Sequence, residues 1–149
     1  MKRLLFLCTG NYYRSRFAEI LFNRQAIERG LAWRADSRGL NPDPRNPGPI
    51  SVHALAALEK LAISTEACQR LPLPATSEDF QVADYIVAVK HAEHHPLIST
   101  RFGNWLDRVE FWHVHDIDCA TPDVALPHLQ AEVLALVERL AAPTYAGGQ

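Results

Sequence analysis

The sequence predicts an α/β fold: a single domain of three layers, α/β/α, with a central four-stranded parallel sheet. Short apolar segments with strand character alternate along the chain with segments whose apolar residues recur at helical spacing. Such alternation is typical of a parallel sheet that is covered by helices on both faces. The 149 residues contain no internal repeat or low-complexity stretch, so residues 1–149 are expected to form one domain.

The first predicted strand and helix stand at the N-terminus. The apolar residues 4–7 predict a short buried strand whose last position is Cys8. The helix that follows is predicted from apolar positions at helical spacing, which are Phe17, Ile20, Leu21 and Ile27. Gly30 is expected to end this helix, because glycine readily adopts the left-handed conformation found just after a helix.

The next predicted elements surround a long loop. Residues 31–37 alternate as in a short strand. Residues 39–49 contain four prolines and two glycines, so they predict a loop that is too long to be a plain connector. Ser51 is a suitable N-cap for a helix with apolar positions at Leu55, Leu58 and Leu61. Residues 64–78 are again rich in Pro, Ser and Thr, and a short turn is expected at 78–80.

The C-terminal half is predicted to supply the other two strands. Residues 84–89 have the β-branched content of a buried strand, and a short polar helix over 91–97 should follow. Residues 109–114 predict the fourth strand. Pro122 and Pro127 bound the start of a last amphipathic helix. Right-handed crossovers then place three loops at one edge of the sheet: residues 8–15, the proline-rich loop and the loop after the fourth strand.

The segment from Cys8 to Ser15, CTGNYYRS, contains the strongest chemical signal. A five-residue loop between strand and helix can point successive backbone N–H groups inward at the positive end of the helix. Arg14 would add a planar fork for two phosphate oxygens, and the same field would stabilise a Cys8 thiolate as nucleophile. Gly10 would let the backbone approach the ligand, and Asn11 tolerates a positive φ. The segment therefore predicts a site for phosphate or another oxyanion.

We assign the residues around this nucleophile to substrate binding: Thr9, Gly10, Asn11, Tyr12, Tyr13 and Ser15. The two tyrosines predict an aromatic wall that stacks on a phenyl phosphate, which favours phosphotyrosine over the shorter phosphoserine. The alternative is that at least one of the tyrosines packs in the core. A leaving oxygen also needs a proton, which Asp116 or Asp118, after the fourth predicted strand, can supply.

Residues 4–19, LLFLCTGNYYRSRFAE, resemble the N-terminus of the low-molecular-weight protein tyrosine phosphatases. Members of that family have an apolar strand followed approximately by C-x-G-N-x-C-R-S-P-M-A-E. The matching positions are Cys8, Gly10, Asn11, Arg14, Ser15, Ala18 and Glu19. Two positions depart from the pattern: Tyr13 replaces a second cysteine of many members, and Arg16 replaces a proline.

The resemblance implies hydrolysis of phosphotyrosine, in a protein or a small aryl phosphate, through a phosphocysteine intermediate without a cofactor. Cys8, Arg14 and Asp116 would be the catalytic residues. Asp116 falls where the family has the aspartate of an Asp-Pro pair, but Ile117 follows it here, so Asp118 stays open as the acid. Ser15 would donate to the Cys8 sulfur, and Asn11 would hold the loop shape.

Two other functions fit the same loop. An arsenate reductase shares this fold and anion loop, but its thiol relay needs a close pair of further cysteines. Cys68 and Cys119 are far apart in the sequence, and we expect both to be core residues. The missing Asp-Pro pair and Arg16 also fit a non-catalytic, phosphate-binding regulatory module. Turnover of a simple aryl phosphate would distinguish these functions.

Composition excludes several other classes. The chain has 48% hydrophobic and 21% charged residues, as a globular protein does, and its net charge of −2 gives no general attraction to nucleic acid or membrane. No apolar stretch has the length of a membrane span or signal peptide, so a cytoplasmic location is expected. Two histidine groups, His113 with His115 and the three in residues 91–95, lack a full set of metal ligands at customary spacing. We expect these histidines to be partly exposed and predict no metal site.

Overall fold

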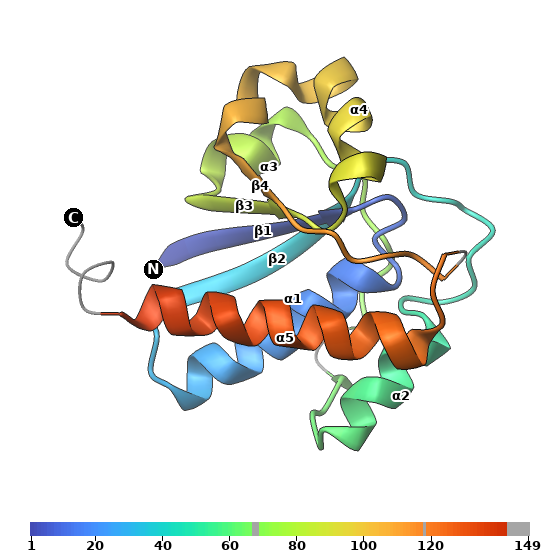
Figure 1. Ribbon diagram of the computed structural model, residues 1–149, viewed down its shortest axis with the longest axis vertical. Helices are drawn as coiled ribbons and strands as arrows, with labels where there is room; N and C mark the ends of the chain where they lie inside the picture. The colour runs from blue at the N-terminus through green and yellow to red at the C-terminus, as the bar shows by residue number, and fades with distance from the viewer. Residues whose placement is uncertain (67–68, 118, 143–149) are drawn as a thin grey trace.

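The four strands form one parallel sheet in the order β2-β1-β3-β4 (Figure 1). The computed structural model describes residues 1–66, 69–117 and 119–142. The strands are β1 (Lys2–Cys8), β2 (Trp33–Gly39), β3 (Tyr85–Ala88) and β4 (Val109–Phe111). The predicted four-stranded parallel sheet is therefore confirmed, with the first strand of the chain at an inner position.

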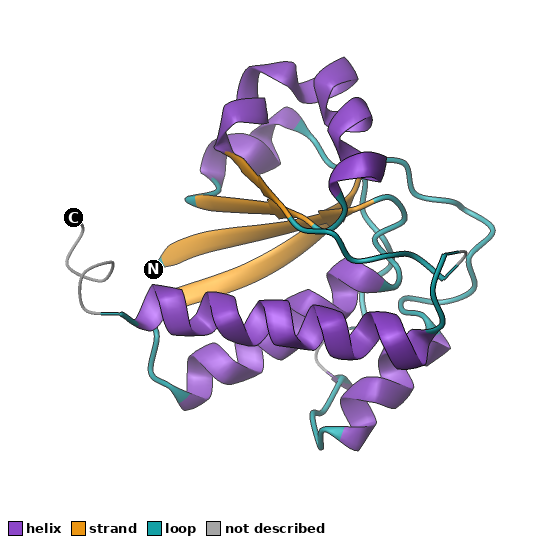
Figure 2. Cartoon of the chain, viewed as in Figure 1, coloured by secondary structure: helices purple, strands orange, loops and turns teal. Residues whose placement is uncertain are grey.

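Helices cover both faces of this sheet, as Figure 2 shows. On one face lie α1 (Arg14–Glu28), α2 (Val52–Lys60) and α5 (Pro122–Ala141). On the other face lie α3 (Ser77–Val82), α4 (His91–Phe102) and the 3₁₀ helix η2 (Gly103–Arg108). The predicted three-layer α/β/α architecture is thus confirmed, and no helix of the described residues is long and apolar enough to span a membrane.

The strand β1 is buried on both faces, which explains its uninterrupted apolar run. Leu4 and Phe6 pack into the apolar core under α1 and α5, whereas Leu5 and Leu7 pack into the core under α3 and α4. Cys8, at the end of the strand, belongs to the first of these cores. The alternation of side chains along one strand therefore decides on which side of the sheet the cysteine lies.

The predicted helix boundaries in the first half of the chain depend on local capping. Gly30 has φ 65°, and the N–H of Leu31 bonds back to the carbonyl of Ala26 at 2.9 Å, so glycine ends α1 as predicted. Ser51 caps α2 as predicted, because its hydroxyl accepts the N–H of His53 at 3.2 Å. Ile27, one of the apolar positions from which α1 was predicted, lies in the helix but is 72% exposed.

Two predicted elements in the second half differ in length. The strand expected over 109–114 ends at Phe111. Beyond it the N–H groups of Trp112 and Val114 still bond to the carbonyls of Ala88 and Val89, at 2.9 and 2.8 Å, and an isolated bridge joins Lys90 and His113. The helix expected over 91–97 continues through Pro96 to Phe102. Its later turns are held by packing, because Ile98 and Phe102 are buried in the core under α4. Tertiary packing here overrides the local preference against proline in a helix.

Candidate active site

Three loops meet at the carboxyl end of β1 around a cavity of about 330 Å³. The end of β1 and the loop after it contribute Cys8, Tyr13 and Arg14, among others. The proline-rich loop and the start of α2 contribute residues 46 and 51–53, and the segment after β4 contributes Asp116 and Ile117. The sequence analysis expected these same three loops to share one edge of the sheet, and this expectation is confirmed.

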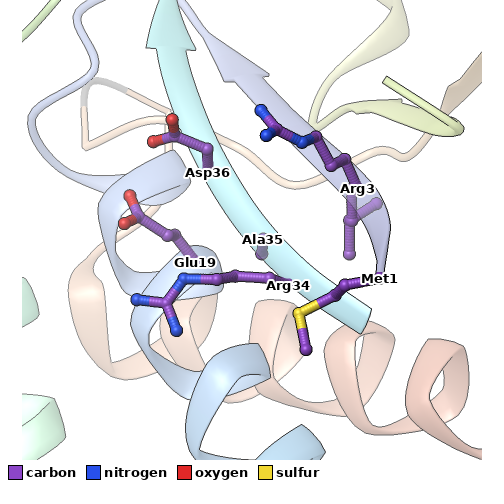
Figure 3. A pocket seen from close by; sticks show the side chains of 7 residues that line it. Met1, Arg3, Glu19, Arg34, Ala35 and Asp36 are labelled. Atoms are coloured by element: carbon purple, nitrogen blue, oxygen red, sulfur yellow. The ribbon is translucent and has the colours of Figure 1, made fainter. Parts of the chain in front are cut away.

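A larger cavity, of about 550 Å³, lies elsewhere in the fold (Figure 3). Its walls come from the N-terminal end of β1, from β2 and from α1, with side chains that include Arg3, Arg34, Glu19 and Asp36. It contains no cysteine, serine or histidine among its described lining residues. The chemistry predicted from the sequence therefore belongs to the smaller cavity.

The conformation of the loop after β1 is fixed by Asn11, which is fully buried. Its φ of 51° is the positive value predicted for this position. Its Nδ2 donates to the hydroxyls of Ser15 at 2.9 Å and Ser37 at 2.8 Å. Its Oδ1 accepts the N–H of Leu73 at 3.0 Å and Nη1 of Arg70 at 2.9 Å. Every hydrogen-bonding position of this amide is used, so the Asn11 side chain ties the loop to the neighbouring segments of the protein.

The cysteine sulfur lies at the centre of this loop. Cys8 Sγ and Ser15 Oγ are 2.9 Å apart, and the backbone N–H of Asn11 points at the sulfur from 3.3 Å. In the thiolate form the Ser15 hydroxyl is the donor of that pair. The residue as a whole is only 2% exposed, yet it lines the cavity, so the sulfur is reached through the cavity alone.

The arginine of the loop, Arg14, is buried and held by three groups. Its Nη1 donates to the carbonyl of Val114 at 3.1 Å, and its Nη2 lies 2.8 Å from Glu93 Oε2 and 3.4 Å from Asp116 Oδ2. Burial alone would lower the pKa of Arg14. The charge of Cys8, the hydrogen bond to Glu93 and the two carboxylate charges together raise it instead.

Glu93, in the first turn of α4, is a site residue that was not predicted from the sequence. Its carboxylate also accepts from the Thr9 hydroxyl and lies 3.1 Å from His94 Nε2. Burial would raise the pKa of Glu93, but the hydrogen bonds from His94, Arg14 and Thr9 hold it far below its usual range. The one available signal was its position just after β3, at the edge where active-site loops gather.

His94 is completely buried, which corrects the expectation that the histidines of residues 91–95 are partly exposed. Its Nδ1 accepts the backbone N–H of Lys90 at 3.1 Å, so Nε2 carries the proton and donates toward Glu93. Burial lowers the pKa of His94 more than the neighbouring carboxylate raises it. This histidine is therefore neutral near neutral pH.

The two tyrosines of the loop have different surroundings. The Tyr12 hydroxyl donates to the carbonyl of Pro47 at 2.6 Å, and the N–H of Ser51 donates to the Tyr12 carbonyl at 2.9 Å, so Tyr12 joins the proline-rich loop to the anion loop. Tyr13 is 8% exposed, belongs to the core and meets the ring of His53 edge to face at 6.5 Å. Both tyrosines line the cavity, and Tyr13 also packs in the core, as expected for at least one of the two.

The remaining predicted residues occupy the following places. Gly10 lines the cavity, whereas Thr9, Asn11 and Ser15 support the loop from behind rather than facing the cavity. Asp116 lines the cavity beside Arg14. Asp118 and Cys68 lie outside the described residues. Cys119 is exposed, so the expectation that it is a core residue is wrong. Within the described ranges no three His, Cys, Asp or Glu side chains are placed to hold a metal ion.

Comparison with known proteins gives one consistent family. The model of the family described as low molecular weight phosphotyrosine protein phosphatase matches residues 3–140. The chain is 35% identical over 106 residues to a protein-arginine-phosphatase of Bacillus subtilis (strain 168), which covers 71% of this chain and 67% of that protein. These matches extend well beyond the C-x5-R loop.

Solved structures give the same result. A low molecular weight protein tyrosine phosphatase from Bacillus subtilis is similar with a TM-score of 0.76 and 28% identity, over 93% of this chain and 96% of that one. A YwlE arginine phosphatase mutant with a phosphorylated active site serine is similar with a TM-score of 0.79 and 25% identity, over 95% and 97% of the two chains.

Proposed function

Because the chain belongs to the low-molecular-weight phosphotyrosine protein phosphatase family, we propose that it hydrolyses phosphotyrosine and related aryl phosphates through a phosphocysteine. One observation supports this most directly. A cysteine sulfur, an arginine guanidinium and a carboxylate from three different segments of the chain converge on one cavity: Cys8, Arg14 and Asp116. The family match establishes phosphatase ancestry, and the preference for an aryl ester is our inference from the walls of the cavity.

In the first step the Cys8 thiolate attacks phosphorus. An S–P bond forms, the P–O bond to the leaving group breaks, and the proton of Asp116 moves to the departing oxygen. Arg14 and the backbone N–H groups of the loop hold the equatorial oxygens of the phosphoryl group. Asp116 lies 3.4 Å from Arg14, so it is close to where the leaving oxygen would be.

In the second step water replaces the sulfur. Asp116, now a carboxylate, takes a proton from the water as its oxygen bonds to phosphorus, and the S–P bond breaks to return the thiolate. The Ser15 hydroxyl, 2.9 Å from Cys8 Sγ, would donate to the leaving sulfur and stabilise its charge. Phosphate leaves, and no cofactor or metal takes part in the scheme.

The cavity walls support an aromatic substrate. The rings of Tyr12 and Tyr13 and the exposed side chains of Val52 and Ile117 surround the approach to Cys8. Such walls would pack on a phenyl ring. A phosphoserine side chain is short and has no ring that could pack against these walls while its phosphate reaches the sulfur. The cavity therefore favours phosphotyrosine.

A phosphorylated arginine is the second candidate substrate. It is favoured by the 35% identity to a protein-arginine-phosphatase and by the similarity to an arginine phosphatase with a phosphorylated active-site serine. A guanidinium group is planar and also stacks on aromatic rings. Among the described residues that line the cavity, Asp116 is the one acidic side chain. It could serve a phosphoguanidinium group as well as a phenyl phosphate.

Paired kinetics would decide between these substrates. We expect the chain to release phosphate from p-nitrophenyl phosphate and from a phosphotyrosine peptide with a higher kcat/KM than from the matching phosphoarginine peptide. The Cys8→Ser variant should lose turnover and still bind inorganic phosphate, because the nucleophile and the anion loop are separate functions. A higher kcat/KM on phosphoarginine would transfer the proposal to that substrate, and turnover by the serine variant would exclude a phosphocysteine.

A further inference from the structure

We propose that Glu93 is a positioning residue for Arg14. The Glu93 carboxylate holds the Arg14 guanidinium in place and offsets part of its positive charge. As a result, the loop binds free phosphate less tightly than it would without Glu93. The proposal rests on the function proposed above, in which Arg14 grips the phosphoryl group. It concerns a side chain outside the C-x5-R loop, in the first turn of α4. Its consequence is that removing the charge of Glu93 strengthens anion binding while it shifts the pH dependence of catalysis.

Two carboxylates, from different segments of the chain, lie near the same nitrogen of Arg14. Glu93 Oε2 lies 2.8 Å from Nη2, and Asp116 Oδ2 lies 3.4 Å from it. Asp116 lines the cavity, whereas Glu93 is not among the described residues that line it. A phosphate that enters the cavity would therefore compete with Asp116 for the guanidinium group. The ion pair between Arg14 and Glu93 would stay intact.

Glu93 is itself held firmly in this position. The Thr9 hydroxyl and Nε2 of His94, at 3.1 Å, donate to the same oxygen that contacts Arg14. His94 is in turn fixed by the backbone N–H of Lys90 at 3.1 Å. A carboxylate with three donors does not move when the cavity fills, so it is suited to orient the guanidinium plane for two phosphate oxygens.

The charge of Glu93 has a second effect. An isolated guanidinium in a buried loop attracts a phosphate dianion strongly, because opposite charges at contact distance interact well when water is excluded. The paired carboxylate offsets this attraction, equally for the ground-state phosphate and for the product. Because weaker product binding speeds release, the enzyme keeps the orientation of Arg14 without trapping phosphate.

Two substitutions separate charge from position. Glu93→Gln keeps the chain length and an acceptor oxygen for Arg14 but removes the charge. Calorimetry with inorganic phosphate on the full chain should show a dissociation constant lower by about tenfold. Both limbs of the pH–rate profile on p-nitrophenyl phosphate should move to lower pH, since loss of a nearby anion eases ionisation. Glu59→Gln, an exposed acid on α2, should change neither quantity.

Glu93→Asp tests the position, because it keeps the charge and withdraws the carboxylate by one methylene. Phosphate affinity should stay within about twofold and kcat should fall by about tenfold, since the guanidinium loses its alignment. An unchanged or weaker phosphate affinity in Glu93→Gln would overturn the charge offset. Full kcat in Glu93→Asp would overturn the positioning role, and it would do so even if the Gln variant failed to fold.

Phosphate binding is measured without turnover, so the two proposals fail in different ways. If the wild-type chain binds phosphate but hydrolyses neither phosphotyrosine nor phosphoarginine, the proposed function is wrong and the comparison of phosphate affinities still decides the charge offset. If the chain hydrolyses its substrate but Glu93→Gln binds phosphate no more tightly than wild type, the proposed function is retained and the charge offset by Glu93 is wrong.

Discussion

The side chain of Asn11 shows how a single residue determines the geometry of the anion loop. Its positive φ turns the chain, and its amide joins the loop to Ser15, to Ser37 on β2 and to Arg70 in the segment before α3. A strained backbone position of this kind persists only when the surroundings over-determine it. The positive φ of Asn11 was predicted from the sequence, but the distant partners of the amide could not be predicted, because nothing local marks Arg70 as one of them.

The general acid can be identified by mutation, because Ile117 follows Asp116 where the family has proline and Asp118 comes next. General acid catalysis matters most for a basic leaving oxygen. We therefore expect Asp116→Asn to lower kcat much more on phenyl phosphate than on p-nitrophenyl phosphate, by about 10²-fold on the former, and to lose the basic limb of the pH–rate profile. Asp118→Asn is the matched control. If the asymmetry follows Asp118 instead, the alignment through Ile117 is shifted by two residues.

The buried His94 predicts a pH dependence of stability. Its pKa is lowered in the folded protein, whereas the unfolded chain binds a proton near the ordinary value of 6.5. Below that pH the unfolded state binds more protons, so the free energy of unfolding should fall as the pH drops from about 7 toward 5. His94→Gln keeps a donor toward Glu93 and removes the titration, so its unfolding curves should show a shallower slope over this range. An equal slope in both proteins would contradict the assignment.

A second loss of stability should occur at lower pH and has a different origin. The pKa of Glu93 is depressed from its ordinary value of 4.5, so the stability that its ionised form contributes is complete above that value. It is lost as the pH falls through the folded value. His94→Gln should keep this second loss, because glutamine retains a donor toward Glu93.

At the scale of elements, hydrogen bonds between the anion loop and the proline-rich loop determine the shape of the cavity. Residues 40–51 form no helix or strand, yet they bond to the anion loop through the backbone of Thr9 and through both the carbonyl and the hydroxyl of Tyr12. The sequence showed that this segment had to be a loop and placed it at the correct edge. The bond from Tyr12 to Pro47 was not predictable, because it depends on where a proline-rich chain without regular structure folds back.

Removal of the Tyr12 hydroxyl tests this hydrogen bond between the two loops. Tyr12→Phe keeps the ring that lines the cavity and loses the hydrogen bond to the Pro47 carbonyl, which should cost about 1 kcal/mol of local stability. We expect KM for a phosphotyrosine peptide to rise severalfold with kcat little changed, because the chemistry at Cys8 is untouched. A fall in kcat with constant KM would show instead that the loop orders the catalytic groups. Tyr85→Phe, on β3 away from the cavity, is the matched control.

The ends of the elements divide into those that local sequence controls and those that packing controls. Gly30 and Ser51 were predictable because each acts within one turn of its own helix. The early end of β4 and the extension of α4 past Leu97 were not predictable. They depend on which partner strand continues and on the burial of Ile98 and Phe102 under the sheet. These contacts join residues that are distant in sequence.

At the scale of the whole molecule, the parallel sheet explains why three distant segments form one site. Every strand in the order β2-β1-β3-β4 runs in the same direction, so the loops at their carboxyl ends meet at one edge (Figure 1). Cys8 is the last residue of β1, and Glu93 and Asp116 come after β3 and β4. The sequence predicted this meeting for two of the three, and it missed Glu93 because one acid in a helical first turn has many ordinary explanations.

Direct detection of the covalent intermediate tests the central claim most simply. The full chain is mixed with p-nitrophenyl phosphate, quenched in acid during steady-state turnover, and digested for mass analysis of the peptide that contains Cys8. Asp116→Asn should increase the trapped fraction, since Asp116 is proposed to activate the hydrolytic water. We predict one phosphoryl group on Cys8 that disappears when substrate is exhausted. Turnover with an unmodified Cys8 at every quench time, in both proteins, would contradict the phosphocysteine mechanism.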